Sequence, residues 1–411
     1  MLETVTEALK NQLVFSTALT AVVIGVLLLA VAYSIYFERK IAAWIQDRYG
    51  PNRAGWRGVL QPIADGGKFF LKEDIIPGGV DKPLYIFAPA ITFVVALVGV
   101  AVIPWGGWVD LDGDGSWDVA CQAASLDIGL LYLLGVGAMG VYGVVLGGWA
   151  SNNKYSLFGA MRGAAQMLSY EVPMGLAILV VVLTSGSVRL EEIVLSQVGE
   201  GHCWHIVKHP IAFLLVLTTA FAETNRMPFD MPEAEQELVS GYLTEYSSMK
   251  FALYFLGEYA HMIIGSAFIA VMFLGGWHLP LIPWLQPEAT SIWAMLLKMM
   301  VLGGKVAFFM FVYISIRWTL PRFRFDQLMR LAWKKLVPIG MGVAGAATVV
   351  VFIGGDALPL WQEVLLCWVG NAIVVAVAVI FSLRARARGV IVTGRQDNMP
   401  PTSATGTAAG L

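Results

Sequence analysis

Residues 11–37, NQLVFSTALTAVVIGVLLLAVAYSIYF, decide the fold class because these 27 consecutive residues carry no charged side chain. A helix needs about 20 apolar residues to cross the hydrocarbon core of a bilayer. The run is too long for the apolar core of a signal peptide, and no small-residue cleavage pattern follows it. We therefore expect a first transmembrane helix here.

The rest of the chain has the same character. Of its 411 residues, 57% are hydrophobic and only 14% are charged, and the mean hydropathy is +0.70. Further apolar stretches lie at about 83–104, 127–149, 171–186, 209–224, 252–276, 292–316, 336–354 and 361–383. The sequence therefore predicts an all-α fold, a polytopic integral membrane bundle of about nine transmembrane helices.

Lysine and arginine are distributed unevenly between the two sides of this bundle. If alternate connections share a side, one side carries 22 of them, in the segments 38–82, 150–170, 225–250, 317–335 and the tail from 384. The opposite side carries three, at Lys10, Arg189 and Lys208. The positive-inside rule then places the N terminus outside and the C terminus in the cytoplasm.

Cofactor motifs are weak in this sequence. The cysteines, Cys121, Cys203 and Cys367, have no C-x-x-C spacing, so we expect neither an iron-sulfur cluster nor a structural zinc site. A disulfide between the first two is left open. Haem would need axial histidines inside the bilayer, where only His261 and His278 are candidates. We predict that the chain alone binds no metal or redox cofactor.

Two polar segments on the outer side resemble metal sites only in part. Acids between Asp110 and Asp118 match calcium-loop positions, but Cys121 stands where a bidentate Glu belongs, so an ordinary acidic loop is favoured. The histidines and cysteine between His202 and His209 have metal-compatible spacing, although solvated or interfacial side chains are the favoured interpretation.

Residues 56–72 predict an amphipathic helix on the cytoplasmic side. Apolar positions recur at helical spacing, at Trp56, Val59, Leu60, Ile63, Ala64, Gly67, Phe70 and Leu71. Polar residues occupy the opposite face, at Arg57, Gln61, Asp65, Lys68 and Lys72. Such a helix lies along the membrane interface. It is either a surface anchor, which composition favours, or a wall of an apolar ligand's entrance.

The stretch 222–251, AETNRMPFDMPEAEQELVSGYLTEYSSMKF, gathers negative charge beside the membrane. Against only Arg226 and Lys250 stand Glu223, Asp230, Glu233, Glu235, Glu237 and Glu245. One explanation is structural, with Asp230 capping a helix that starts at Pro232. Capping needs only one or two acids, however, whereas carboxylates crowded in a partly dry place retain protons near neutral pH.

Other ionisable groups lie within the predicted spans or at their inner ends. Each is costly in hydrocarbon unless paired or hydrated, and they are Glu38, Glu171, Glu223, Glu258, Lys298 and Lys305. On a helix, Glu233 and Glu237 would also share a face and repel each other. Together these groups indicate proton or cation coupling, with a structural acid cluster as the alternative.

Three long motifs occur in order: ERKIAAWIQDRYGPNRAGWRGVLQPIADGGKFFLKED, AETNRMPFDMPEAEQELVSGYLTEYSSMKFALYFLGEY and RFRFDQLMRLAWKKLVP. They closely resemble the H subunit of bacterial NADH:quinone oxidoreductase, respiratory complex I, whose mitochondrial counterpart is membrane subunit 1. That family ends after eight transmembrane helices. The resemblance therefore implies a membrane domain at 1–355, with quinone-chamber loops at 38–82, 150–170 and 225–250, an additional transmembrane helix at 356–388 and a disordered cytoplasmic tail at 389–411.

The resemblance also implies a function. The family's subunit joins the peripheral electron-transfer arm to the membrane arm, forms much of the quinone chamber and couples quinone reduction to proton translocation. Quinone, either ubiquinone or menaquinone, is then the substrate, and FMN and iron-sulfur clusters belong to partner subunits. The implied partners are peripheral iron-sulfur and quinone-site subunits, small membrane subunits and antiporter-like subunits in the bacterial cytoplasmic (inner) membrane.

Site residues follow from the same resemblance. Those implied at the quinone chamber or the docking surface for the peripheral arm are Trp44, Arg48, Arg53, Asp65, Lys68, Phe69 and Arg226. Those implied in the proton relay or in coupling are Glu38, Tyr142, Glu171, Glu223, Asp230, Glu233, Glu235, Glu237, Glu245, Glu258 and Lys305. The alternatives are a membrane subunit of an energy-converting hydrogenase, an independent proton-coupled transporter and a purely structural docking subunit.

Overall fold

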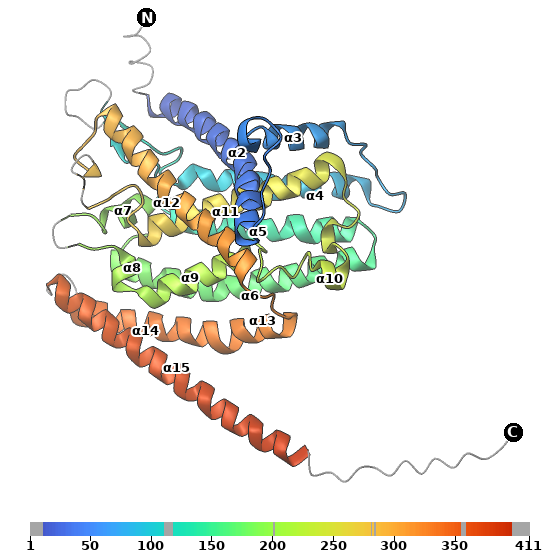
Figure 1. The fold of residues 1–411 in the computed structure, drawn as a ribbon. Coiled ribbons are helices and arrows are strands. Elements are labelled where there is room, and N and C mark those ends of the chain that lie inside the picture. The colour runs from blue at the N-terminus through green and yellow to red at the C-terminus, as the bar shows by residue number, and fades with distance from the viewer. Residues whose placement is uncertain are drawn as a thin grey trace, which may run out of the picture.

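The computed structural model describes residues 11–110, 118–199, 202–280, 282, 285–354 and 359–396. Eight helical segments in these residues are long and apolar enough to span a membrane (Figure 1), which confirms the polytopic bundle. They are α2 (Gln12–Ile45), α4 (Lys82–Val98) with η2 (Gly99–Val102), α5 (Gly129–Ala150), α6 (Lys154–Ser185), α11 (Ser248–Phe273), α12 (Ile292–Thr319), α13 (Phe325–Leu331) with η5 (Ala332–Leu336) and α14 (Val337–Gly354), and α15 (Leu360–Gln396). A further apolar helix, α9 (Pro210–Glu223), has 14 residues, so each of the nine predicted stretches lies mostly in a helix.

Helix α11 occupies the centre of the bundle. It is the most buried of the eight spans and packs against α4, α12, α2 and α9. All of its residues from Ala267 to Phe273 are buried. A helix surrounded by protein is expected to be apolar on every side, so the ionisable residues Glu258 and His261 on α11 need partners. By contrast, α15 packs on α14 at the edge of the bundle (Figure 1).

Hydrogen bonds between distant segments join the connections into two ends. At one end, which we call the acidic end, the connections 46–81, 151–153, 224–247 and 320–324 meet. Ser247 bonds the backbone of Ile75, Asn152 bonds that of Gly79, and Phe323 bonds Pro228. The opposite end holds a hairpin of β1 (Trp108–Val109) and β2 (Val119–Ala120) with α7 (Leu190–Leu195) and α8 (His205–Lys208). Connections between successive spans should alternate between the two ends of the bundle, and the two sets of connections follow this alternation.

Helix boundaries differ from the predicted stretches at three places. The first helix does not end at the first charged residue but continues to Ile45. Glu38 and Trp44 therefore lie in this helix and not in the predicted loop. Helix α6 begins at Lys154, so most of the predicted connection 150–170 is helical. Helix α15 continues to Gln396, and 397–411 of the predicted tail lie outside the described residues.

The predicted amphipathic helix forms as η1 (Trp56–Gly58) and α3 (Gln61–Leu71). It packs on α2 and α11, and the Ser248 hydroxyl donates to the carbonyls of Phe69 and Lys72, at 2.9 Å in each case. No residue of α3 is fully buried, and Phe70 and Leu71 are exposed. The contacts with α2 and α11 thus leave part of its apolar surface uncovered.

The structural explanation with a helix starting at Pro232, capped by Asp230, is wrong. The connection 224–247 contains only two short helices, α10 (Glu235–Leu238) and η3 (Gly241–Leu243). Glu233 precedes α10 and does not share a helical face with Glu237. Asp230 does not act as a cap, because its carboxylate is engaged by Arg322 from another connection.

Candidate functional site

The acidic end contains a buried network of ion pairs with Arg226 at its centre. Arg226 Nε lies 2.5 Å from Glu258 Oε1 of α11, and Nη1 lies 3.6 Å from Glu38 Oε2 of α2. The guanidinium also lies 4.2 Å from the centre of the Tyr259 ring. A buried charge is tolerated when it is paired, so these contacts explain how Arg226 can be only 4% exposed.

Glu38 is a second junction of this network. The Tyr259 hydroxyl donates to Glu38 Oε2 at 2.5 Å, and Arg317 of α12 binds the other carboxylate oxygen. Arg317 and Glu38 are 279 positions apart in the sequence. Because α2, α11 and α12 each supply one of these groups, the network exists only when the bundle has assembled.

Asp230 and Glu233 extend the network into the connection 224–247. Arg322 Nη2 lies 2.6 Å from Asp230 Oδ2, whereas Asp230 Oδ1 is buried without a hydrogen-bond partner among the described residues. Burial raises the pKa of Asp230, although the neighbouring arginines oppose this shift. Burial, reinforced by Glu258 and Asp230, raises the pKa of Glu233 well above its usual value.

The charge balance is consistent with a proton on Glu233. The network contains four carboxyl groups and three guanidinium groups: Glu38, Asp230, Glu233, Glu258, Arg226, Arg317 and Arg322. Burial by itself lowers the pKa of Arg226, but Glu258 and the other nearby carboxylates raise it well above its usual value, so Arg226 stays charged. One proton on Glu233 then leaves equal numbers of carboxylates and guanidiniums. Such a group can gain or lose a proton when the surrounding field changes.

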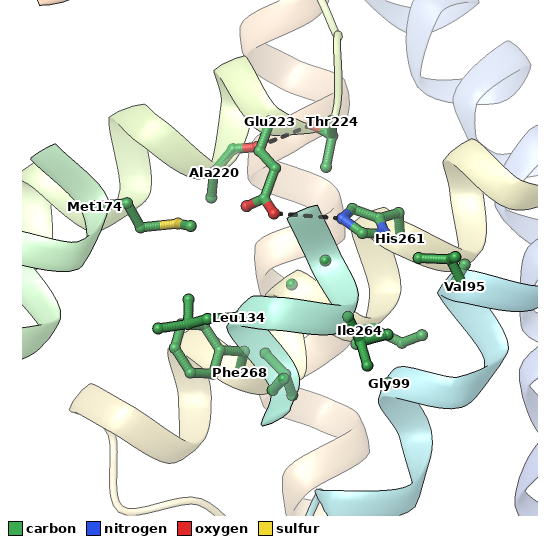
Figure 2. A pocket seen from close by; sticks show the side chains of 15 residues that line it. Val95, Gly99, Leu134, Met174, Ala220, Glu223, Thr224, His261, Ile264 and Phe268 are labelled. Atoms are coloured by element: carbon green, nitrogen blue, oxygen red, sulfur yellow. Dashed lines mark hydrogen bonds and ion pairs between the residues drawn. The ribbon is translucent and has the colours of Figure 1, made fainter. Parts of the chain in front are cut away.

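A second pair of ionisable side chains lies deeper in the bundle. His261 Nε2 of α11 is 3.5 Å from Glu223 Oε1 at the end of α9 (Figure 2). A Cβ atom on Gly137 of α5 would lie only 3.1 Å from that carboxylate oxygen, so the glycine leaves room for it. Since His261 follows Glu258 by three residues, both side chains lie on one face of α11. Polar groups therefore continue from the network toward the middle of the membrane.

Two other predicted relay residues lie outside the ion pairs. Glu171 is half-buried on α6, which packs against the helix that carries Glu223. Tyr142 lies on α5 with 61% of its surface exposed. The structure therefore places Glu171 on a helix that packs against α9, and Tyr142 on the outside of the chain.

The remaining acids of the stretch 222–251 fasten the connection to α6 or lie at the surface. Glu235 and Glu237 are exposed, and Glu237 Oε2 lies 2.5 Å from Arg162 Nη1. Glu245 Oε1 accepts a hydrogen bond of 2.6 Å from Asn153. The acids that appear as one group in the sequence therefore divide into a buried set and a surface set.

Lys305 of α12 lies beside the C-terminal end of α11. Its ammonium donates to the carbonyls of Leu274, Gly276 and His278 at 2.6, 2.7 and 2.7 Å. A cation is stabilised at a helix C terminus, where carbonyl groups lack helical partners. The structure thus gives Lys305 the position of a cap on α11. Lys298 similarly donates to the Ala289 carbonyl at 2.7 Å.

The residues implied at the quinone chamber or docking surface lie together at the acidic end. Trp44, Arg48, Arg53 and Lys68 are exposed, and Phe69 is partly buried against Phe251, with ring centres 6.3 Å apart. Asp65 is tied to α2 by Arg39, at 2.7 Å. Arg226 differs from all of these because it is buried in the ion-pair network.

The described residues contain no group of three or more potential metal ligands. Cys121, Cys203 and Cys367 are free thiols, so the structure contains no disulfide between the first two. His205 and His209 are buried rather than solvated, and burial lowers the pKa of His205 to about 3. Residues 111–117 of the predicted acidic loop lie outside the described residues.

Four contributors to the two clusters were missed by the sequence prediction: Tyr259, His261, Arg317 and Arg322. The i, i+3 relation between Glu258 and His261 was a usable signal, because it places both on one helix face. The two arginines gave no comparable signal, since they belong to a part of the chain far from their acidic partners.

The chain was also compared with known proteins. A family model described as NADH dehydrogenase matches residues 18–344. The NADH-quinone oxidoreductase H subunit of Flavobacterium johnsoniae is 48% identical over 320 residues, covering 78% of this chain and 90% of that protein. The corresponding H 1 subunit of Cytophaga hutchinsonii is 46% identical over 325 residues, with 79% and 93% covered. The H 2 subunit of Koribacter versatilis is 48% identical over 332 residues, with 78% and 92% covered.

Proposed function

The chain belongs to the family of NADH-quinone oxidoreductase H subunits, and we propose that it forms much of the quinone chamber and couples quinone reduction to proton translocation. The observation that carries the proposal is the buried network around Arg226, together with Glu223 deeper in the bundle, which pairs with a residue one turn from Glu258 on α11. Buried ionisable groups are costly in a membrane protein and mark ion or proton routes by default.

The mechanism follows from the surplus of carboxyl groups. Reduction of quinone to neutral quinol consumes equal numbers of electrons and protons, so electrons that arrive before the protons, or protons taken from nearby side chains, make the acidic end more negative. A more negative field favours protonation of Glu233. When the field returns to its original value, release of the proton is favoured. Arg226 contacts both Glu258 and Glu38, so a small movement of its guanidinium changes the charge that each carboxylate experiences. Antiporter-like partner subunits would receive the change.

Within this proposal, the surface of α3 and the connection 46–81 serves as the wall of the chamber and as a docking surface for the peripheral arm. Peripheral partner subunits hold FMN and the iron-sulfur clusters, and small membrane subunits complete the assembly in the bacterial cytoplasmic membrane. The acidic end faces the cytoplasm, as the excess of Lys and Arg indicates. The family match ends at residue 344, which supports the proposal that α15 is an addition to the shared domain.

The test is to replace Glu258 or Glu223 by Gln in the assembled complex and to measure NADH-driven quinone reduction and proton pumping in proteoliposomes. A positioned acid-base group contributes about 10²–10⁴-fold to a proton-transfer rate, so we expect pumping to fall by about tenfold or more with normal assembly. Glu192, exposed on α7 at the opposite end, provides the matched control Glu192→Gln. Wild-type pumping by both test variants would refute the relay.

Purification distinguishes the alternatives. A mild-detergent preparation through a tag on this chain should contain flavin, iron-sulfur clusters and NADH:quinone activity. Hydrogen-dependent activity would favour the hydrogenase alternative, and transport by the chain alone in liposomes would favour the independent transporter. The relatives named above are all NADH-quinone oxidoreductase subunits, which supports the first outcome.

A further inference from the structure

His261 and Glu223 form a pair between two helices. The sequence analysis predicted Glu223 as a relay residue, but not His261. The two side chains come from α11 and α9, and they point toward each other in Figure 2. Their exposed fractions are 22% and 25%, so both are largely removed from the surface. His261 is the thirteenth residue after Ser248 in the 26-residue α11, which places it about 20 Å along the helix at roughly 1.5 Å per residue.

The pair lines a cavity of about 40 Å³. A water molecule needs about 10–15 Å³ of such space, so the cavity has room for about three or four waters. Its other walls are mostly apolar and come from α4, α5, α6 and α11, with Thr224 next to Glu223. The Thr224 hydroxyl donates to the Ala220 carbonyl, which leaves its oxygen able to accept from a water (Figure 2). The polar groups are therefore gathered on one side of a space of water size.

The contact distance argues against a locked structural hydrogen bond. The usual N–H···O distance is about 2.9–3.0 Å, whereas His261 Nε2 lies 3.5 Å from Glu223 Oε1. A histidine that serves only to fix two helices would be expected to make a close bond to a fixed partner. A loose pair beside water-sized space can exchange partners between the carboxylate and water.

The surroundings of His261 identify the groups that can exchange a proton with it. From α9 the ionisable group is Glu223, and the cavity walls from α4, α5 and α6 contribute no ionisable side chain. On α11 itself, Glu258 lies on the same face, one turn nearer to the acidic end. Glu258 is bound to Arg226. His261 thus stands between the buried network and Glu223.

We propose that His261 is a proton-carrying residue that links the Arg226 network to Glu223, an inference that rests on the proposed relay. Imidazole suits this role because it has two nitrogens and changes charge near neutral pH. In the step from His261 to Glu223, the Nε2–H bond breaks and an O–H bond forms at Oε1. The imidazolium becomes neutral imidazole, and the carboxylate becomes a carboxylic acid. Reprotonation of the imidazole comes from the side of Glu258, which lies one turn away on the same face of α11.

The experiment uses the assembled complex with His261→Asn and His261→Gln, which keep a polar side chain on α11. We expect NADH-driven proton pumping to fall by about tenfold, less than the full ~10²–10⁴-fold contribution of an acid-base group, because cavity water still carries part of the flow. The matched control is His202→Asn, since His202 is exposed at the opposite end. Loss of assembly in both test variants would show a structural role and overturn the inference.

A chemical-rescue measurement separates proton transfer from packing. In His261→Gly, added imidazole should restore pumping several-fold, whereas it should not restore pumping in Glu223→Gln. A slow His261→Gly complex that imidazole leaves unchanged would overturn the inference; if that variant does not assemble, the Asn and Gln variants decide. If His261→Asn and His261→Gln pump normally while Glu223→Gln is impaired, His261 does not carry protons, and the inference fails while the proposed relay stands. Normal pumping in all of them would remove the relay itself.

Discussion

Replacement of Arg226 by Met tests whether the buried network is held together by charge. Met has a similar length and keeps the apolar packing, but it removes the guanidinium from between Glu258, at 2.5 Å, and Glu38, at 3.6 Å. Among the described residues, Glu258 has no other ion-pair partner, whereas Glu38 retains Arg317. The Glu258 carboxylate is therefore the group left uncompensated.

The magnitude follows from this difference. Removing one partner of a buried ion pair costs about 3–5 kcal/mol, so Arg226→Met should lower the free energy of unfolding by about that amount. Glu258→Gln removes the orphaned charge, and the double variant should therefore lose less than the sum of the two single variants. Contacting residues usually show couplings of about 0.5–3 kcal/mol, and the short distance places this pair in the upper half of that range.

The assay is denaturant unfolding of the tagged subunit in the purified complex, in mixed micelles, for the two single variants and the double variant. A parallel cycle with Arg226→Met and Glu38→Gln should give a smaller coupling, because Glu38 keeps its second arginine. A cycle with Arg226→Met and Glu192→Gln on α7 should give no coupling energy. Additivity of Arg226→Met and Glu258→Gln within about 0.5 kcal/mol would refute the charge argument.

Three further changes test other parts of the structure. Because the pKa of Glu233 is raised in the folded protein, the folded protein binds more protons than the unfolded chain above about pH 4.3, and its stability falls as the pH rises from there. Glu233→Gln should remove this part of the pH dependence of the melting temperature. An unchanged slope of melting temperature against pH from about 5 to 8 would contradict the prediction. Lys305→Met leaves three carbonyls without their donor and should cost about 2–3 kcal/mol in denaturant unfolding, whereas no measurable loss would exclude a capping role. Lys208→Glu should lower the melting temperature by breaking the 2.9 Å pair with Glu363 of α15, and the exchange Lys208→Glu with Glu363→Lys should restore it; lack of restoration would show that the pair does not hold α15.

Much of the architecture was predictable because it depends on local composition. A run of about 20 apolar residues has to form a helix in a bilayer, since every backbone polar group must be bonded within the chain. This is why the nine stretches, including 11–37 and 361–383, all lie mostly in helices. Boundaries were less predictable: a hydropathy scan stops at charged residues such as Arg162, whereas the backbone hydrogen bonds of α6 continue through that segment.

The candidate site was only partly predictable. The sequence by itself determined that acids gather between 222 and 251, and that Glu38 and Glu258 lie within predicted spans or at their inner ends, where unpaired charge is costly. Only the tertiary structure decided that Asp230 is buried in the network and that Glu233 interacts electrostatically with Glu258 and Asp230, while Glu235 and Glu237 stay at the surface. The physical reason is that burial and pairing depend on distances in space. Arg317 reaches Glu38 across 279 positions of sequence, and no local pattern encodes that approach.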